Sequence, residues 1–273
     1  VLSPTPVPDR LEDDVRDWVR AAAPVAGLVH ADGGMPDLAE ALSTLAARTG
    51  TFLIGGLTCS RGAQAQIAGG IVNGGISGAL FSPAVGIVSG VTQGCTPLGE
   101  MHTVTEGAEN VIVTLDGRQA LDVFKEDIGE MLARDLGRVA GYVHAALPVA
   151  GTDTRDYLVR NLIGIDPERG WLAIGNEVRA GDRIMFVRRD PMSAQTDLRR
   201  MLDDVMRRLD GPARGAVYVS CVARGPAMFG DEGREAAIVA ESLGGAPVIG
   251  FYANGEISND RLYSYTGVLM AFC

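Results

Sequence analysis

The sequence predicts an α/β protein with two related lobes of mixed β-sheet covered by helices, and with an internal β-α-β-β duplication. Apolar runs of strand length alternate with amphipathic helical segments along the chain. The 36 glycines among 273 residues supply many tight corners, and one order of elements occurs twice. A hydrophobic content of 47% is ample for one large domain or two ordinary ones.

The N-terminal third is predicted to contain two helices and several strands. The segment "DRLEDDVRDWVRAAAP" places its apolar residues on one helical face and ends before Pro24. A second helix, in "GGMPDLAEALSTLAARTG", has leucines on one face and Gly50 as its stop. Strands are expected in "VAGLVH", "TFLIGGLTCSR", "GGISGALF" and "VGIVSGV".

The rest of the chain continues the alternation. The strand "NVIVTL" leads into an Asp116-Gly117 turn and an amphipathic helix, and "WLAIGNEVRAGDRIMFVRR" predicts a hairpin with its turn at residues 180–182. The longest helix, "SAQTDLRRMLDDVMRRLDG", has Ser193 as a candidate cap. After it we expect the strand "GAVYVSC", the helix "DEGREAAIVAESLGG" and the strands "VIGFYANGEI" and "YTGVLMAFC".

Residues 26–81 and 215–272 show the same order of elements. "LVH" in the first segment corresponds to "YVS" in the second, "LIGG" to "VIGF", and "GGISGALF" to "YTGVLMAF". We therefore predict that a β-α-β-β unit has been duplicated within the chain.

Charge and hydropathy exclude several classes of protein. With 24 basic and 34 acidic residues, the formal net charge is −10 and no basic stripe is present. Nucleic acid and anionic membrane surfaces are therefore not expected as partners. The longest apolar stretch, residues 76–91, is broken by glycines and a proline, and no signal peptide is found, so we expect a cytoplasmic protein. The chain begins at Val1 rather than Met, so we expect that an upstream part has been removed or left out.

Candidate ligand-binding residues cluster where the repeated strands end. In the first repeat the strand is followed by Thr58, Ser60 and Arg61, and in the second by a glycine-rich loop and a polar corner. The loop and the corner contribute the candidate residues Cys221, Arg224, Gly225, Asn254 and Glu256. Loops at strand ends are the usual place for function in α/β units, and a guanidinium suits a carboxylate or phosphate.

Structural roles explain the same residues. Arg224 could pair with Glu256, and Asn254-Gly255 is a common turn dipeptide. If Arg224 instead faces an open hollow, we expect Arg224→Ala to abolish ligand binding without unfolding the chain.

Signals of catalysis and metal binding are sparse. No nucleophile elbow, phosphate-binding loop or zinc motif is present, and the four cysteines form no CxxC pair, as in reduced cytosolic proteins. Cys221 is the candidate nucleophile of a thiol-dependent enzyme, although an inert buried thiol is the competing interpretation. His102 and His144 are expected to be ordinary core or solvated histidines. We predict no metal site and no catalytic residue.

The segments "FLIGGLTCSR", "QGCTPLGEMHTVTEGAENVIVTLDGRQALDVF" and "GAVYVSCVARGPAMFGDEGREAAIVAESLGGAPVIGFYANGEI" resemble the FIST family over nearly the whole chain. The more specific signature is "C-x-x-RG", a helix, then "P-V-x-G-F-x-x-x-GEI". The resemblance implies a FIST N-like part in residues 1–136, incomplete at its start, and a FIST C-like part in residues 137–273. It also implies a sensory or signal-transduction module that binds a small ligand.

We therefore predict a non-catalytic sensory module that binds an amino-acid-like or carboxylate metabolite in a cleft between the lobes. Arg224 would hold a carboxylate, Glu256 an amino group, and Asn254 would orient the ligand. The family resemblance implies a separate signalling partner, a histidine kinase or a cyclic-di-GMP enzyme. Two alternatives stay open: a haem-binding nitric oxide sensor, which the resemblance implies, and a thiol-dependent enzyme that uses Cys221. Otherwise no cofactor is expected.

Overall fold

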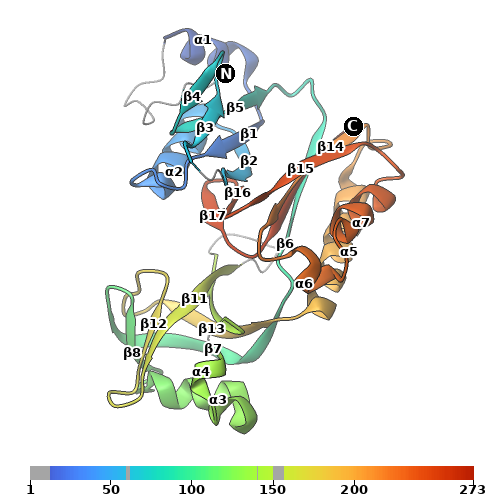
Figure 1. The fold of residues 1–273 in the computed structure, drawn as a ribbon. Helices are drawn as coiled ribbons and strands as arrows, with labels where there is room; N and C mark the ends of the chain where they lie inside the picture. The colour runs from blue at the N-terminus through green and yellow to red at the C-terminus, as the bar shows by residue number, and fades with distance from the viewer. Residues whose placement is uncertain (1–12, 60–61, 140, 150–156) are drawn as a thin grey trace. The chain divides into compact units, whose positions relative to one another are not determined.

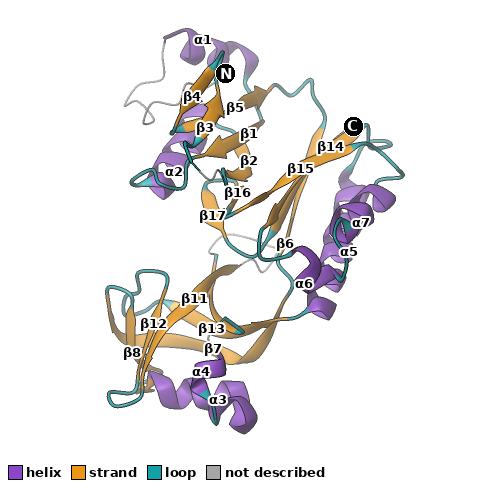
Figure 2. Ribbon diagram, in the orientation of Figure 1, coloured by secondary structure: helices purple, strands orange, loops and turns teal. Residues whose placement is uncertain are grey.

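A computed structural model describes residues 13–59, 62–139, 141–149 and 157–273. The chain forms two compact units, one made of Val1–Gln93 with Gln195–Cys273 and the other of Gly94–Ala194. Helices and strands alternate along it (Figure 1; Figure 2), which confirms the predicted α/β class. None of the helices within these ranges is long and apolar enough to cross a membrane.

The first unit holds two sheets and a separate hairpin. The larger sheet has the order β17-β16-β2-β1-β5 and the smaller one β15-β14-β18-β6, while β3 and β4 pair only with each other. Its strands are β1 (Ala26–Ala31), β2 (Phe52–Leu57), β3 (Ala65–Ile67), β4 (Ile71–Asn73), β5 (Ile76–Phe81), β6 (Ile87–Thr92), β14 (Gly215–Cys221), β15 (Val248–Ala253), β16 (Glu256–Ser258), β17 (Arg261–Tyr263) and β18 (Gly267–Phe272).

Helices cover these sheets. Leu38, Leu42 and Leu45 of α2 pack on the larger sheet, because their spacing places them on one helical face, and Gly50 ends this helix with φ of 65°. The helices of this unit are α1 (Asp13–Ala22), α2 (Leu38–Thr49), α6 (Gly225–Phe229), α7 (Arg234–Ser242) and most of α5 (Pro191–Arg208), whose first four residues belong to the second unit. The start of α5 is capped by Asp190, whose Oδ1 accepts from the Ser193 N–H at 2.9 Å, so Ser193 is not the cap.

The two repeats follow the same path. In the first repeat, β1 pairs parallel with β2 and antiparallel with β5; in the second, β14 pairs parallel with β15 and antiparallel with β18. Gly55 and Gly250 hold equivalent places, since a Cβ at either would collide with the carbonyl oxygen of Val29 or Tyr218 on the neighbouring strand. The duplication is therefore present.

One detail of the predicted correspondence is wrong by a residue. Val29 lies opposite Gly55 and Gly78, and Tyr218 lies opposite Gly250 and Leu269. The pairing therefore aligns Val29 with Tyr218, so that "VHA" rather than "LVH" corresponds to "YVS". This one-residue difference in alignment matters because adjacent residues of a strand point to opposite faces of the sheet.

The second unit is an antiparallel sheet with one long helix. Its order is β12-β11-β10-β13-β7-β8-β9, and an additional β12–β8 pairing closes six of these strands on themselves. Phe124 of α3 packs edge-on against Phe186 in its core. The elements are β7 (Cys95–Ala108), β8 (Val111–Leu115), β9 (Arg118–Gln119), α3 (Ala120–Ala133), α4 (Leu136–Val139), β10 (Val143–Pro148), β11 (Tyr157–Asp166), β12 (Trp171–Ile174) and β13 (Arg183–Arg189).

The predicted hairpin of residues 171–189 has the right strands and the wrong pairing. β12 pairs with β11 and β8, whereas β13 pairs with β10 and β7. The connection between them instead runs beside β7 and β8, where the Val178 and Gly181 N–H groups donate to the carbonyls of Glu109 and Val104. A single sequence shows strands but not which strand lies beside which.

Candidate functional site

The residues proposed from the sequence occupy three environments in the first unit. Thr58 lines a cavity, Asn254 is exposed in the turn between β15 and β16, and Gly225 is buried at the start of α6. Cys221, Arg224 and Glu256 are buried. Ser60 and Arg61 lie outside the described residues. The ligand-binding role of this set stays a prediction.

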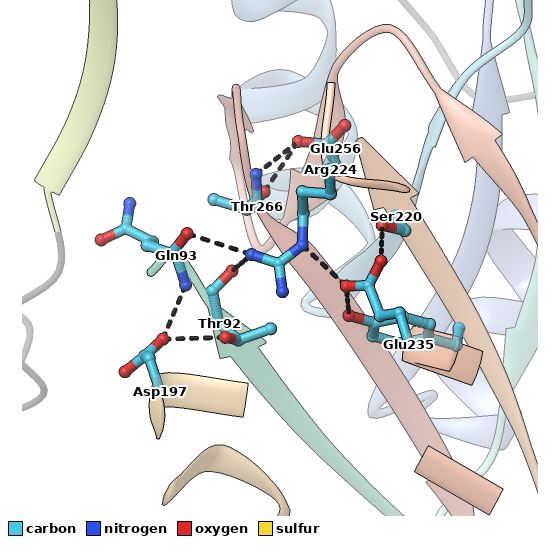
Figure 3. Close-up of polar contacts among 9 residues, drawn as sticks. Thr92, Gln93, Asp197, Ser220, Arg224, Glu235, Glu256 and Thr266 are labelled. Atoms are coloured by element: carbon cyan, nitrogen blue, oxygen red, sulfur yellow. Dashed lines mark hydrogen bonds and ion pairs between the residues drawn. The ribbon is translucent and has the colours of Figure 1, made fainter. Parts of the chain in front are cut away.

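Arg224 sits at the centre of a buried polar network (Figure 3). Its side chain is 1% exposed, and its Nε lies 2.7 Å from Glu235 Oε1. The hydroxyls of Tyr218 and Ser220 donate to the same carboxylate at 2.7 and 2.8 Å. The partner of Arg224 is therefore Glu235 of α7 and not Glu256, and the pair is charge-assisted and desolvated.

The other side of the guanidinium contacts the end of β6. Nη1 donates to the carbonyl oxygens of Gln93 at 3.0 Å and Thr92 at 3.5 Å, while Nη2 has no partner within the described ranges (Figure 3). Asp197 of α5 accepts from the Gln93 N–H and the Thr92 hydroxyl at 2.7 and 2.8 Å. Arg224 thus binds the carbonyl groups of Thr92 and Gln93, and Asp197 binds the Gln93 N–H and the Thr92 hydroxyl. These are the last two residues before the chain leaves the first unit.

The local role of Arg224 changes what its removal should do. Arg224→Ala would leave the Glu235 carboxylate buried and lacking its cation, which is costly. The expectation that this substitution spares the fold is therefore replaced by an expectation of destabilisation.

Glu256 is the second buried carboxyl group. Its Oε2 accepts from the N–H and hydroxyl of Thr266 at 3.1 and 2.8 Å, whereas Oε1 has no partner among the described residues. Burial outweighs these hydrogen bonds and raises the pKa of Glu256 to about 7. Burial, together with the Glu256 charge, raises the pKa of the Cys221 thiol to about 11. Cys221 is therefore a protonated thiol at neutral pH, not a poised nucleophile.

A cavity of about 650 Å³ lies between the two repeats, both of which belong to the first unit. Its polar lining comprises His30, Thr58, Cys59, Gln66 and Ser77. Its apolar and aromatic lining includes Leu28, Ile67, Ala79, Phe251 and Tyr252. Concave sites of this size with a mainly apolar wall and a few polar groups are typical of small-molecule binding.

Two contacts organise the polar wall of the cavity. The His30 ring packs against Phe251 with centroids 5.1 Å apart, and the Ser77 hydroxyl donates to Gln66 Oε1 at 2.7 Å. Gln66 Nε2 has no partner in the described part of the chain, although Gln66 is only 2% exposed. The amide therefore keeps two unused donors at the edge of the cavity.

The same place in the second repeat is filled. By the strand pairing, Val219, Val268 and Met270 hold the positions of His30, Ser77 and Ala79, and each is 0% exposed. Val219 packs against Gly56 of the other repeat. The equivalent contact of the first repeat is His30 against Phe251, because His30 corresponds to Val219 and Phe251 to Gly56. Each repeat thus meets the other at an equivalent place, which we call a junction. The junction at His30, Ser77 and Ala79 is hollow and the one at Val219, Val268 and Met270 is filled, because their side chains differ.

A model of the FIST N domain matches residues 6–118, and a model of the FIST C domain matches residues 120–259. The chain belongs to the FIST family. FIST domains are associated with sensory and signal-transduction roles and with the binding of small ligands. The predicted division into residues 1–136 and 137–273 stays a prediction.

Mycobacterial relatives share a large part of this FIST chain. The uncharacterized protein Rv0628c of Mycobacterium tuberculosis is 36% identical over 205 residues, which are 70% of this chain and 52% of that protein. The uncharacterized protein Mb0898c of Mycobacterium bovis is 36% identical over 196 residues, 67% of this chain and 49% of that protein. The FIST chain therefore spans about half the length of the curated relatives it matches.

The histidines of this FIST chain differ in their environments. Burial lowers the pKa of His30, which keeps the imidazole neutral, and lowers the pKa of His144 to about 4. In the second unit, His102 lies between Asp116 and Asp127, with N–O distances of 2.6 and 2.8 Å. Burial alone would lower the pKa of His102, but the two carboxylates outweigh it and raise that pKa. Of the three, only His30 lines a described cavity.

A second cavity of about 720 Å³ lies beside α7 of the FIST chain. Tyr218, Ser220 and Glu235 line it, and Phe251 and Tyr252 belong to both cavities. The Glu235 carboxylate in this lining is already engaged by Tyr218, Ser220 and Arg224. The sequence did not single out Gln66, and His30 was expected only as the first residue of a loop that lines the cleft; the polar histidine in an otherwise apolar strand was a usable signal. Among the described residues no cluster of three or more metal-ligating side chains occurs.

Proposed function

We propose that this chain is a sensory module that binds a small ligand in the cavity between its two repeats. The observation that carries the proposal is the contrast between the two junctions. One is packed with Val219, Val268 and Met270, and the equivalent one is hollow and lined by His30, Ser77 and Ala79. The second repeat shows that side chains of this fold can fill this place. The unfilled place in the first repeat is therefore the proposed binding site.

The lining favours an uncharged ligand with an apolar body and a hydrogen-bonding edge. None of the described lining residues carries a fixed charge, and His30 is neutral because burial lowers its pKa. The Gln66 amide, the Thr58 hydroxyl and the His30 imidazole supply donors and acceptors, and Phe251 and Tyr252 supply aromatic surface. A carboxylate or amino-acid ligand was predicted through Arg224 and Glu256, but both are buried and engaged elsewhere.

The experiment copies the filled junction into the hollow one. Ala79→Met introduces the residue that Met270 provides in the second repeat, and Ala47→Met on the exposed face of α2 is the matched control. Small molecules released from each purified protein are identified by mass spectrometry, and their binding is measured by calorimetry. We expect Ala79→Met to lose the co-purified compound and to reduce its affinity by more than tenfold.

The control separates the cavity from general effects of the substitution. Ala47→Met should retain both the compound and its affinity. Unchanged binding to a folded Ala79→Met protein would remove the cavity from consideration as the ligand site.

Haem remains a second candidate ligand because of His30. Its imidazole is neutral, lines the cavity and makes no hydrogen bond within the described residues, and neutral imidazole is a common axial ligand of haem iron. The described lining offers no basic side chain for the haem propionates. A Soret band in the reconstituted protein that is lost in His30→Ala would favour haem over an organic metabolite, and its absence would exclude haem.

We also propose that the output is delivered to a separate signalling protein, a histidine kinase or a cyclic-di-GMP enzyme. The support is the association of FIST domains with signal transduction. Ligand-dependent co-elution with a candidate kinase, compared between wild type and Ala79→Met, tests this step separately from ligand binding.

A further inference from the structure

The strand β15 has an open edge that its counterpart does not have. β15 is terminal in its sheet, and Ile249 and Tyr252 on it are 73% and 46% exposed. The equivalent residues of β2, Ile54 and Leu57, are 0% and 7% exposed. An apolar edge strand without proline or charge is a ready template for another strand.

The edge of β2 is covered by a strand from the other repeat. β16 pairs antiparallel with β2, placing Glu256 opposite Gly56, Ile257 opposite Gly55 and Ser258 opposite Ile54. β16 and β17 form the hairpin that lies in the chain between β15 and β18 of the second repeat. One repeat therefore lends its hairpin to close the sheet of the other.

The first repeat has the same hairpin in the same position. β3 and β4 lie in the chain between β2 and β5, just as β16 and β17 lie between β15 and β18. Their central pair, Gln66 with Val72, corresponds to Ile257 with Leu262. Unlike β16, β3 pairs with no strand but its own partner in the hairpin.

The geometry points to a strand-docking surface on β15 whose occupant is β3 of the same chain. Transferring the register of β16 on β2 places Gln66 opposite Gly250, Ile67 opposite Ile249 and Ala65 opposite Phe251. Because β3 and β15 both line the 650 Å³ cavity, this pairing closes the cavity between them. In the docked register Ala65 and Ile67 face this cavity, whereas Gln66, opposite Gly250, turns toward α7, so that Thr58 and His30 supply the hydrogen bonds of the enclosed space. The inference rests on the proposed function only in that the enclosed space is the ligand site.

Exposure of the two strands supports this docking. Ile67 and Ile71 of the hairpin are 77% and 86% exposed, and the facing Ile249 is 73% exposed. An isolated two-stranded hairpin is marginal in water, whereas a strand added to a sheet gains a ladder of backbone hydrogen bonds. Docking would bring Ile67 and Ile249 together on one face, where cross-strand apolar pairs stabilise a sheet.

The experiment is a cross-link in the full chain, in a Cys59→Ser background and without added ligand. Ile67→Cys with Ile249→Cys places two thiols on opposed residues, whose Cα atoms in an antiparallel pair lie roughly 4.5–5.5 Å apart, within disulfide reach. After mild oxidation, a non-reducing gel and peptide mapping identify the bond. We expect a 67–249 disulfide within one chain.

The matched control is Ile71→Cys with Ile249→Cys. Ile71 is at least as exposed as Ile67 but lies one strand further out, so in the docked state it is roughly 10 Å from residue 249, beyond disulfide reach. A 67–249 bond that does not form, or forms no faster than the 71–249 bond, overturns the inference. A bond between two chains also overturns it, because the occupant would then be a second copy.

The outcome is separable from the ligand-binding test. If the disulfide forms but the Ala79→Met substitution leaves ligand binding intact, docking stands and the proposed site fails. If filling abolishes binding but no disulfide forms, the site stands and docking fails.

Discussion

The two repeats of the first unit share a backbone path and place their polar side chains on opposite faces of it. In the first repeat the face toward α2 is apolar, with Val29 and Ala31 at 0% exposure, and the other face carries His30 and Ser77. In the second repeat Tyr218 and Ser220 bind Glu235 of α7, and the other face carries Val219 and Val268.

Because the polar side chains lie on opposite strand faces, they form a structural network in the second repeat and line a candidate binding site in the first. The buried side chains of Arg224 and Glu235 neutralise each other, so they hold the second repeat together and are already engaged with each other rather than with a ligand. The polar groups of the first repeat face a hollow, and the Gln66 amide nitrogen there has no described partner. A duplicated fold can thus keep one copy for stability while the other binds a ligand.

The largest effect should come from breaking the network of the second repeat. We expect Arg224→Ala to lower the free energy of unfolding by about 3–5 kcal/mol, because the Glu235 carboxylate would remain buried without its cation. Urea denaturation followed by circular dichroism measures this. The double variant Arg224→Leu with Glu235→Leu should lose less than Arg224→Ala, since it removes both charges. A single variant as stable as wild type would show that the pair is not desolvated.

A second, smaller effect should appear as a pH dependence of the free energy of unfolding. It arises from Glu256 of β16, the strand that pairs with the edge of β2. Burial raises the pKa of Glu256 in β16 to about 7, above the ordinary value of 4.5. The folded state therefore binds the proton more tightly, and stability falls as pH rises from about 4.5 to about 7. At about 1.36 kcal/mol per pKa unit, the loss of stability is about 3 kcal/mol.

The Glu256→Gln variant isolates the contribution of Glu256 to the pH dependence of stability. The amide keeps the shape of the protonated carboxyl and does not titrate, so the fall in melting temperature between pH 5 and 8 should become shallower. If the two proteins show parallel profiles, Glu256 is charged in the folded chain at all these pH values.

The smallest effect should come from making the hollow junction resemble the filled one. His30→Val copies Val219, and we expect a change in stability below about 1 kcal/mol at pH 7. Because burial lowers the pKa of His30 below 6.5, the folded state favours the neutral ring. Wild type should therefore lose stability as pH falls below 6.5, and His30→Val should lose less. A large loss at pH 7 would mean that the imidazole makes a stabilising contact.

Much of the local structure could be predicted from residue patterns. The helix of residues 38–49 follows from its leucine spacing and Gly50, and the duplication follows from repeated apolar runs separated by glycines. These features depend on interactions between residues close in the chain, which a sequence displays directly. The pairing of β12 and β13 with other strands was missed because it depends on partners distant in the chain.

By itself the sequence determined the elements, their repetition and the FIST resemblance, since periodicity and turn residues act within a few positions. Tertiary structure alone decided that Arg224 faces Glu235 and not Glu256, that β16 crosses to the sheet of the other repeat, and that one junction is hollow. Each of these depends on which of two strand faces a residue occupies and on what lies across from it. A shift of one residue reverses the face, and no local pattern reports the neighbour beyond it.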